Sequence, residues 1–244
     1  MNRSDRRRHI LQLALPIIGA MVSQSILNLV DTAMVGQLGD AALAAVGLGG
    51  LVVFAGQAVV IGFSRAVQTI AAHRKGQDRL HESAQVLNAA LLIILLVSPF
   101  LSAVLIFAAP YFYPLLNPDP QVIAAGVPYF EVRILATVFV GMNYAFRGYW
   151  NAIDQSRLYL TTLLVIHTSN IVLNYVLIFG HFGAPAMGVT GAGLASAIAV
   201  ALGTATYFLL AFRHARSNGF LRGLPPWADI RSLISQSIPN SIND

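Results

Sequence analysis

The sequence predicts an all-α, polytopic membrane protein: a six-helix transmembrane bundle, followed by the start of a seventh helix. Hydrophobic residues make up 56% of the 244 residues and charged residues only 10%, whereas soluble domains carry roughly 25% charged residues. The mean hydropathy is +0.67. Six apolar segments are each long enough to cross a bilayer, which takes roughly 20 helical residues. The sequence contains no cysteine, which excludes disulfides, thiol nucleophiles and thiolate metal sites.

The six segments are predicted to be helices because a chain in lipid must satisfy its backbone polar groups within each segment. They cover about residues 10–37, 41–64, 84–109, 122–151, 157–180 and 186–212. Short polar connections separate most of them. The longer connection from Pro110 to Gln121 contains four prolines and three consecutive aromatic residues. This composition predicts a loop anchored at the membrane interface.

The positions of the Lys and Arg residues predict the orientation of the chain. Thirteen of the fifteen lie before the first segment, between the second and third, between the fourth and fifth, or after the sixth. These stretches fall on one side of the membrane, and the opposite connections carry none. The positive-inside rule therefore predicts a multi-pass protein of the cell inner membrane with a cytoplasmic N-terminus. The net charge of +5 reflects this topology, so no nucleic-acid partner is expected.

Residues near the two ends of the chain share a pattern. Arg8 to Pro16 opens the first segment, and Arg231 to Pro239 has the same spacing of arginine, apolar residues and proline. Two repeated bundles are a common transporter plan. We therefore predict a first bundle over residues 1–224 and the start of a truncated second bundle over 225–244. A short match also arises by chance, and this alternative stays open.

Asp31 is the candidate coupling residue because it is an acid within an apolar helix and has no Lys or Arg near it in sequence. A charged Asp at the centre of a membrane helix costs about 2.5–3.5 kcal/mol and should face the protein interior or water. Gln24 and Asn28 share its helix face. This stripe predicts a carboxylate that binds and releases a cation. The alternative is a wetted, inert Asp near the mouth of the bundle.

A second polar stripe lies on the fifth segment, where His167, Asn170 and Asn174 are three and four residues apart. Side-chain amides can coordinate Na⁺ or hydrogen-bond a carboxylate across the bundle. Membrane Asn residues also hold helices together, with a contribution of about 1 kcal/mol. Because Asp31 is present, a shared site and helix association both remain open for the two Asn residues. His167 is predicted to be structural.

Two further residues, Glu131 and Arg133, are candidate supports. Glu131 and Arg133 in the fourth segment point in nearly opposite directions on an ideal helix, so each should find a partner on another helix. Arg147 lies near the cytoplasmic end and can extend its charge to the interface. Pro16 removes a backbone hydrogen bond and predicts a bend in the first helix, although it can equally mark a helix start.

Motifs for other chemistry are absent. The sequence contains no zinc-protease motif, Walker loop, nucleophile elbow or Cys/His cluster. We therefore predict no enzyme activity, no cofactor and no metal apart from Na⁺ at Asp31. Without a nucleotide motif, any transport would be driven by an ion gradient or be passive.

Several stretches taken together carry a family resemblance across about residues 9–224. They are Leu15-Pro16, VDTAMVGQLG at 30–39, AAHRKG at 71–76, FEVR at 130–133, NIVLN at 170–174 and GVTGAGLAS at 188–196. The chain resembles the N-terminal bundle of the multidrug and toxic compound extrusion (MATE) family. Glu131 and Arg133 resemble the subgroup related to the DNA-damage-inducible F protein.

The resemblance implies a twelve-helix secondary antiporter of two six-helix bundles, which exchanges H⁺ or Na⁺ for organic, often cationic, drugs. It implies that Asp31 binds the coupling cation, that Asn170 shares this site and that the first helix bends at Pro16. Ser196 stands where a Thr is common in the family. Asn174 departs from the Asp of several subgroup members, which leaves one acid in the site. The missing C-terminal bundle would be a partner of this chain.

Three functions remain open, in order of preference. The first is cation-coupled export of organic, cationic or amphipathic drugs by a protein of which this chain is the N-terminal half. The second is a lipid-linked precursor flippase, which would be expected to line its cavity with several Arg residues. Only Arg133 and Arg147 are available for that role. The third is a non-transporting membrane protein or fragment.

Overall fold

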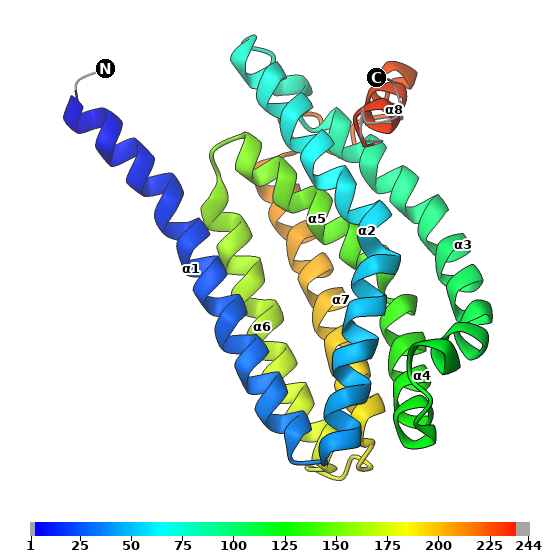
Figure 1. Ribbon diagram of the computed structural model, residues 1–244. Helices are drawn as coiled ribbons and strands as arrows, with labels where there is room; N and C mark the ends of the chain where they lie inside the picture. The colour runs from blue at the N-terminus through cyan, green and yellow to red at the C-terminus, as the bar shows by residue number, and fades with distance from the viewer. Residues whose placement is uncertain (1–2, 238–244) are drawn as a thin grey trace.

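The computed structural model describes the backbone of residues 3–237, and the side chains from residue 15 onward apart from Pro16 and Ser237. Within this range the chain is helical and contains no strand (Figure 1). Its elements are α1 (Arg3–Gly36), α2 (Asp40–Gly76), the short 3₁₀-helix η1 (Leu80–Glu82), α3 (Gln85–Leu116), α4 (Pro120–Leu135), α5 (Thr137–Ala152), α6 (Ser156–Phe179), α7 (Gly188–His214) and α8 (Trp227–Ser237).

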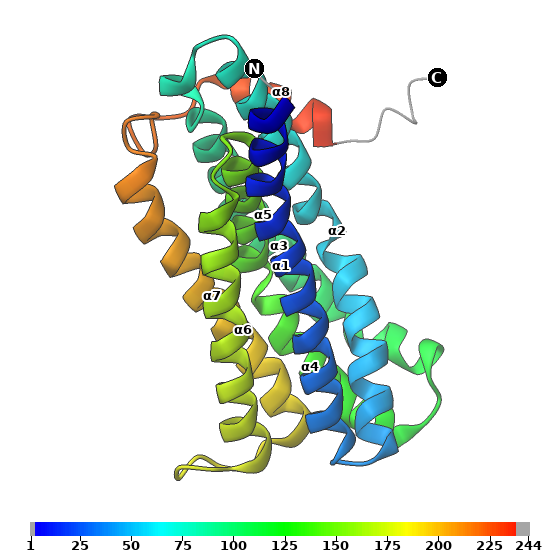
Figure 2. The same cartoon turned by 90° about the vertical axis from the view of Figure 1, so that its left-hand side faces the viewer.

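Helices of membrane-spanning length make up most of the fold. Five helices are long and apolar enough to cross a membrane, namely α1, α2, α3, α6 and α7. The pair α4 and α5 passes the same test together, which gives up to six spans. The predicted all-α, six-helix fold is confirmed. Figure 2 shows α1 on the outside of the bundle, against α6. Only 11% of its most apolar window is buried, against 28–33% for the other four spans.

The fourth predicted segment, 122–151, is a broken helix and not a continuous one. It bends by 51° where α4 meets α5, at Ala136. Side chains from neighbouring helices satisfy the backbone there: Ser102 donates to the carbonyl oxygen of Ile134 at 2.7 Å, and Gln57 donates to that of Arg133 at 3.4 Å. Gln57 also donates to the hydroxyl of Thr137 at 3.3 Å. Such partners make a break tolerable at membrane depth, and they come from α2 and α3, which local sequence does not reveal.

The predicted interfacial loop from Pro110 to Gln121 is wrong in extent. α3 continues through Pro110 and Pro114 to Leu116, and α4 begins at Pro120. Tyr113 explains the extension, because its side chain is fully buried. A Cβ added at Gly126 of α4 would lie 2.8 Å from the Tyr113 ring. This packing outweighs the backbone hydrogen bonds that the prolines remove.

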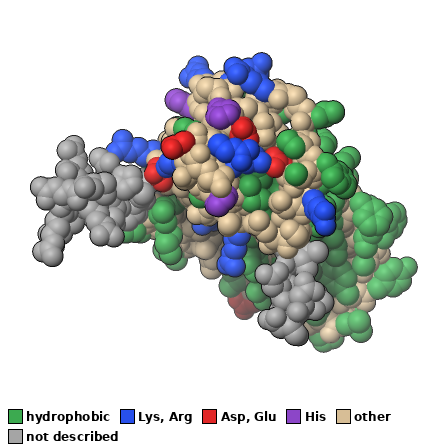
Figure 3. Space-filling view, turned by 90° about the horizontal axis from the view of Figure 1, so that it is seen from above, with side chains coloured by type: hydrophobic (Ala, Val, Ile, Leu, Met, Phe, Trp, Pro, Cys, Tyr) green, Lys and Arg blue, Asp and Glu red, His purple; other side chains and the backbone are tan. Residues whose placement is uncertain are grey.

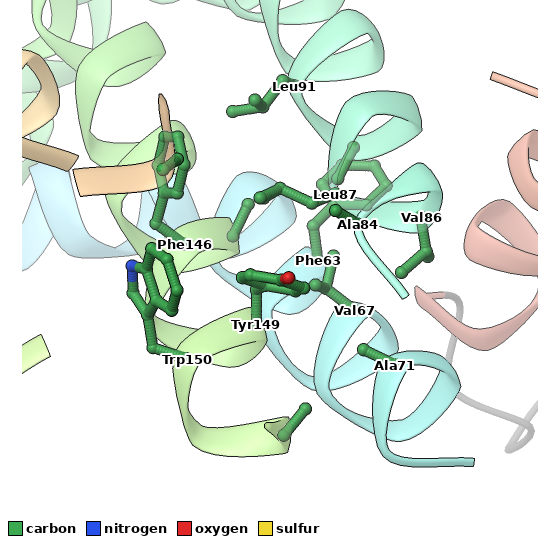
Figure 4. Packing of buried hydrophobic residues seen from close by; sticks show 14 of the residues in the cluster. Phe63, Val67, Ala71, Ala84, Val86, Leu87, Leu91, Phe146, Tyr149 and Trp150 are labelled. Atoms are coloured by element: carbon green, nitrogen blue, oxygen red, sulfur yellow. The ribbon is translucent and has the colours of Figure 1, made fainter. Parts of the chain in front are cut away.

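The helix α2 also extends beyond its predicted end at residue 64 and ends at Gly76. The added turns are held by the largest apolar cluster, in which Val67 and Ala71 are fully buried. Figure 4 shows this cluster between α2, α3 and α5. Close approach of α5 to α2 depends on Gly148, since a Cβ there would lie 2.2 Å from the Ser64 carbonyl oxygen.

The basic residues gather at one end of the bundle, called here the basic end. It carries Arg74, Lys75, Arg79, Arg157, Arg213, Arg216 and Arg222, and Figure 3 looks onto it. The connections 37–39, 117–119 and 180–187 lie at the opposite end (Figure 1). This arrangement agrees with the predicted grouping of charges. The side of the membrane that the basic end faces stays a prediction.

The helix α8 is fastened to the basic end. Arg74 of α2 and Asp229 of α8 form an ion pair whose side chains are only 12% and 6% exposed. The loop before α8 is held by Asn88, which donates to the Gly219 carbonyl oxygen at 2.9 Å and accepts from the Leu221 N–H at 3.0 Å. That α8 starts a second bundle stays a prediction, and Pro239 of the repeat pattern lies outside the described residues.

The substitution Arg74→Gln is expected to release α8, because removing one partner of a buried ion pair destabilises by about 3–5 kcal/mol. The chain has no cysteine, so Leu233→Cys gives a unique thiol at a fully buried position. Maleimide labelling of this thiol should become roughly tenfold to a hundredfold faster in the Arg74→Gln background. The control is Arg79→Gln, in the more exposed pair with Glu82. Equal labelling rates in all backgrounds would contradict the anchoring role.

Candidate functional site

Asp31 lies in α1, half-buried in the seam between α1 and α6. Asn174 of α6, which is 1% exposed, donates from Nδ2 to Asp31 Oδ1 at 2.6 Å. It also donates to Asn170 Oδ1 at 2.9 Å. Asn170 in turn donates from Nδ2 to the hydroxyl of Ser196 on α7 at 3.0 Å. A continuous hydrogen-bonded chain therefore runs from Asp31 to Ser196 across three helices.

The two polar stripes meet because they have the same spacing on helices that run in the same direction (Figure 1). Gln24 and Asp31 are seven residues apart on α1, and His167 and Asn174 are seven apart on α6. Seven residues make about two turns, so both members of each pair lie on one face. Gln24 accordingly bonds to His167 at 3.2 Å, and Asp31 to Asn174 at 2.6 Å.

Two oxygen atoms of this site have no hydrogen-bond partner among the described residues. Asn174 Oδ1 is buried without a donor, because both donated bonds of this amide leave from Nδ2. Asp31 Oδ2, on the half-buried carboxylate, is the second, since the hydrogen bond from Asn174 goes to Oδ1. One turn further along each helix, Val35 and Ile178 are 1% exposed and close the site with apolar surface. A buried oxygen without a donor calls for an explanation, and oxygen atoms are the ligands that hard cations prefer.

Gln24 and Asn28 share the helix face of Asp31 but lie on the exposed part of α1. Gln24 donates to Asn28 Oδ1 at 3.0 Å, and neither residue hydrogen-bonds Asp31 within the described part of the chain. His167 is 4% exposed and bonds through Nδ1 to the Ser23 hydroxyl at 2.6 Å. The structure thus divides the predicted stripe into two groups: the Asp31 group, and a Gln24–Asn28–His167 group that lies between one and two turns closer to the basic end.

The supporting candidates are dispersed. Arg133 is half-buried on α4 and acts electrostatically on Asp31, without forming an ion pair with it. Glu131 is half-buried and makes no hydrogen bond or ion pair with the described residues. The bend at Pro16 stays a prediction: α1 is one helix from Arg3 to Gly36, and the Pro16 side chain lies outside the described residues.

Arg147, the other arginine of the fourth span, is enclosed by aromatic rings. Its guanidinium carbon lies 5.7 Å from the ring centre of Tyr144 and 5.1 Å from that of Tyr159. These distances fit cation–π interactions.

Gln57 and Ser23 are polar residues of the bundle that the sequence did not single out. Gln57 on α2 is 5% exposed and joins α2 to the α4–α5 break. It was detectable as the sole amide side chain of the apolar segment 41–64. Ser23 gave no signal, because Ser in a helix ordinarily bonds its own backbone, as Ser25 does to the Met21 carbonyl at 3.1 Å.

Comparison with known proteins places the chain in a family. The MatE family profile matches residues 16–176, about two thirds of the chain. The chain belongs to the MATE family. A probable multidrug resistance protein NorM of Synechococcus sp. is 32% identical over 93% of this chain and 48% of its own length. The multidrug resistance protein PmpM of Pseudomonas aeruginosa is 29% identical over 78% of this chain and 41% of its own length.

Solved MATE structures share the fold described above. A MOP superfamily transporter from Pyrococcus furiosus aligns with a TM-score of 0.84 at 20% identity, covering 96% of this chain and 52% of that one. An outward-facing MATE transporter gives the same values. This MATE chain is therefore a multi-pass membrane protein that spans about half the length of the curated relatives it matches. The predicted DNA-damage-inducible F subgroup stays a prediction, since these relatives carry the names NorM and PmpM.

Proposed function

We propose that this chain is the N-terminal bundle of a secondary antiporter that couples entry of H⁺ or Na⁺ to export of organic, cationic or amphipathic drugs. The proposal depends on one observation: the half-buried Asp31 carboxylate is bonded to the buried Asn174, whose amide oxygen has no partner in the described part of the chain. The multidrug-resistance names of its MATE relatives support the substrate class.

Either coupling cation suits these atoms. For Na⁺, Asp31 Oδ2 and Asn174 Oδ1 are the oxygen ligands, while Asn170 and Ser196 hold the Asn174 amide in place. For H⁺, the protonated carboxyl gains an O–H donor, and Asn174 Oδ1 is a nearby acceptor. Both occupants neutralise Asp31, and the neutral acid is far less costly among apolar helices than the charged one.

Coupling follows from a difference in cation affinity between conformations. A bundle arrangement that wets Asp31 favours the empty, charged carboxylate, and one that excludes water favours the occupied site. A ligand shifts a conformational equilibrium only as far as its affinities for the two states differ. Gln24 and Asn28, exposed and nearer the basic end, offer a polar route to Asp31.

The remaining parts of the transporter belong to the same proposal. The N-terminus and the basic end face the cytoplasm of a cell with this protein in its inner membrane, as the charge bias favours. The second bundle follows α8, and the drug is bound and released between the two bundles as they alternate.

The test is drug efflux by the complete protein in vesicles loaded with a fluorescent organic cation. A pH gradient and a Na⁺ gradient are imposed separately. One of them should accelerate efflux well above that of protein-free vesicles, and dissipating that gradient should abolish the effect. Efflux that responds to neither gradient would overturn the proposal.

A further inference from the structure

Arg133 is a partly buried cation for which the described residues offer no partner. Its guanidinium makes no hydrogen bond or ion pair with them, and its Nε is buried without an acceptor. Leaving a buried donor unpaired is unfavourable, more so for a charged group. A cationic side chain at membrane depth is generally paired or placed on a functional path. The hydrogen bonds and ion pairs of the described residues therefore do not explain why an arginine lies at this position.

The position of Arg133 is set by the contact between α4 and α7. The two helices touch closely where a Cβ on Gly193 would lie 3.2 Å from the Tyr129 carbonyl oxygen. They run in the same direction (Figure 1), so one turn further along, Arg133 reaches the level of Ser196. Ser196 ends the hydrogen-bonded chain that starts at Asp31. Arg133 is also the charged group whose field acts on Asp31.

Other charges are poorly placed to serve Asp31. Among the helices packed around it, α6 carries Arg157 in its first turn, at the basic end. Its other titratable side chain, His167, lies two turns closer to the basic end than Asn174 and is bonded to Ser23. α2 begins with Asp40, beyond the end of α1, and carries its other charges near the basic end, as α7 does. Arg133 on α4 is thus the fixed positive charge that the carboxylate meets inside the bundle.

We infer that Arg133 is the internal counter-ion of the coupling site, which competes with the coupling cation for Asp31 and so sets how readily that cation leaves. This inference rests on the proposed function, since it assigns the release step of the same site. The empty carboxylate is stabilised by the nearby guanidinium. When H⁺ or Na⁺ neutralises Asp31, the attraction between the carboxylate and the Arg133 guanidinium is lost. This loss lowers the affinity of the site for the coupling cation and so favours its release.

The backbone around Arg133 gives this competition a means of changing with conformation. Its carbonyl oxygen accepts a bond from Gln57 at 3.4 Å, three residues before the 51° break at Ala136. A change in the bend would move Arg133 relative to Asp31. The strength of the competition would then differ between conformations, which is what coupled exchange requires.

The experiment measures cation binding to the purified, complete protein in lipid nanodiscs. The probes are radioactive Na⁺ alone at fixed pH, and protons alone, followed through the infrared carboxyl band that Asp31→Asn removes. Arg133→Gln should bind the coupling cation about tenfold more tightly, the change expected for loss of one nearby unit charge. Arg133→Lys, which keeps the charge, should stay near wild type. Arg147→Gln is the matched control, since Arg147 is the other arginine of the same bent span and packs against Tyr144 and Tyr159.

The outcomes separate this inference from the function on which it rests. Unchanged or weaker binding in Arg133→Gln, with binding abolished in Asp31→Asn, would overturn the counter-ion role and leave the proposed function standing. Wild-type binding in Asp31→Asn would overturn both. If the Gln variant does not fold, Arg133→Met provides an uncharged side chain of similar length and is judged by the same affinity change.

Discussion

In the complete protein, Asp31→Asn is expected to abolish coupled drug export. Efflux of a fluorescent organic cation should fall at least roughly a hundredfold, to the level of protein-free vesicles, because the neutral amide has no cation affinity to couple to the drug. The substitution keeps the size of the side chain, and an Asn at this position can still bond to Asn174. Transport should therefore be lost while the helices stay packed.

The control for this variant is Asp40→Asn, which removes the next acid along the chain. Asp40 is exposed at the start of α2 and is not a member of the hydrogen-bonded site. Its variant should export the drug at a rate close to wild type. Export that survives in Asp31→Asn, in vesicles with a matched amount of protein, would exclude Asp31 as the coupling residue.

Asn174→Ala is expected to weaken cation binding by about ten- to a hundredfold, the range for losing a group that both orients and supplements a cation ligand. The change removes the donor at 2.6 Å from Asp31 Oδ1 and the unpartnered amide oxygen together. The measurement is the concentration of H⁺ or Na⁺ that gives half-maximal drug efflux, which should rise by this factor.

Asn143→Ala provides the matched comparison. Asn143 also joins two helices, donating to the Val200 carbonyl oxygen at 3.0 Å and accepting from the Thr204 hydroxyl at 2.9 Å, but it lies outside the chain that starts at Asp31. Both Ala variants should lower thermal stability by a similar amount. An equal half-saturating cation concentration in the two variants would show that Asn174 serves only to hold helices together.

The fold class followed from local properties of the chain. Hydropathy alone indicated the spans, because lipid obliges each segment to satisfy its own backbone and leaves little choice except a helix. Local signals failed at proline-rich positions. Pro110 and Pro114 predicted a loop, yet burial of Tyr113 keeps the helix going to Leu116. The break at Ala136 went unpredicted because the side chains that stabilise it, Gln57 and Ser102, belong to other helices.

The candidate site was predictable as a set of residues but not as a geometry. Helical periodicity placed Asp31 on one polar stripe and Asn170 and Asn174 on another. It could not say which of the two Asn residues bonds the acid, since that depends on the register between α1 and α6. It also grouped Gln24 and Asn28 with Asp31, although the structure leaves both exposed and bonds Gln24 to His167.

By itself, the sequence determined that this chain is a helical membrane bundle with one acid in its first span and a one-sided distribution of positive charge. Runs of apolar residues and the 3.6-residue helical period predict these properties from local sequence. Only the tertiary structure decided that Asn174 bonds Asp31 and keeps an amide oxygen without a partner among the described residues, and that the charge of Arg133, from a distant segment, acts on Asp31. The reason is physical: lateral packing between helices is set by the shapes of many side chains at once, and no local pattern records it.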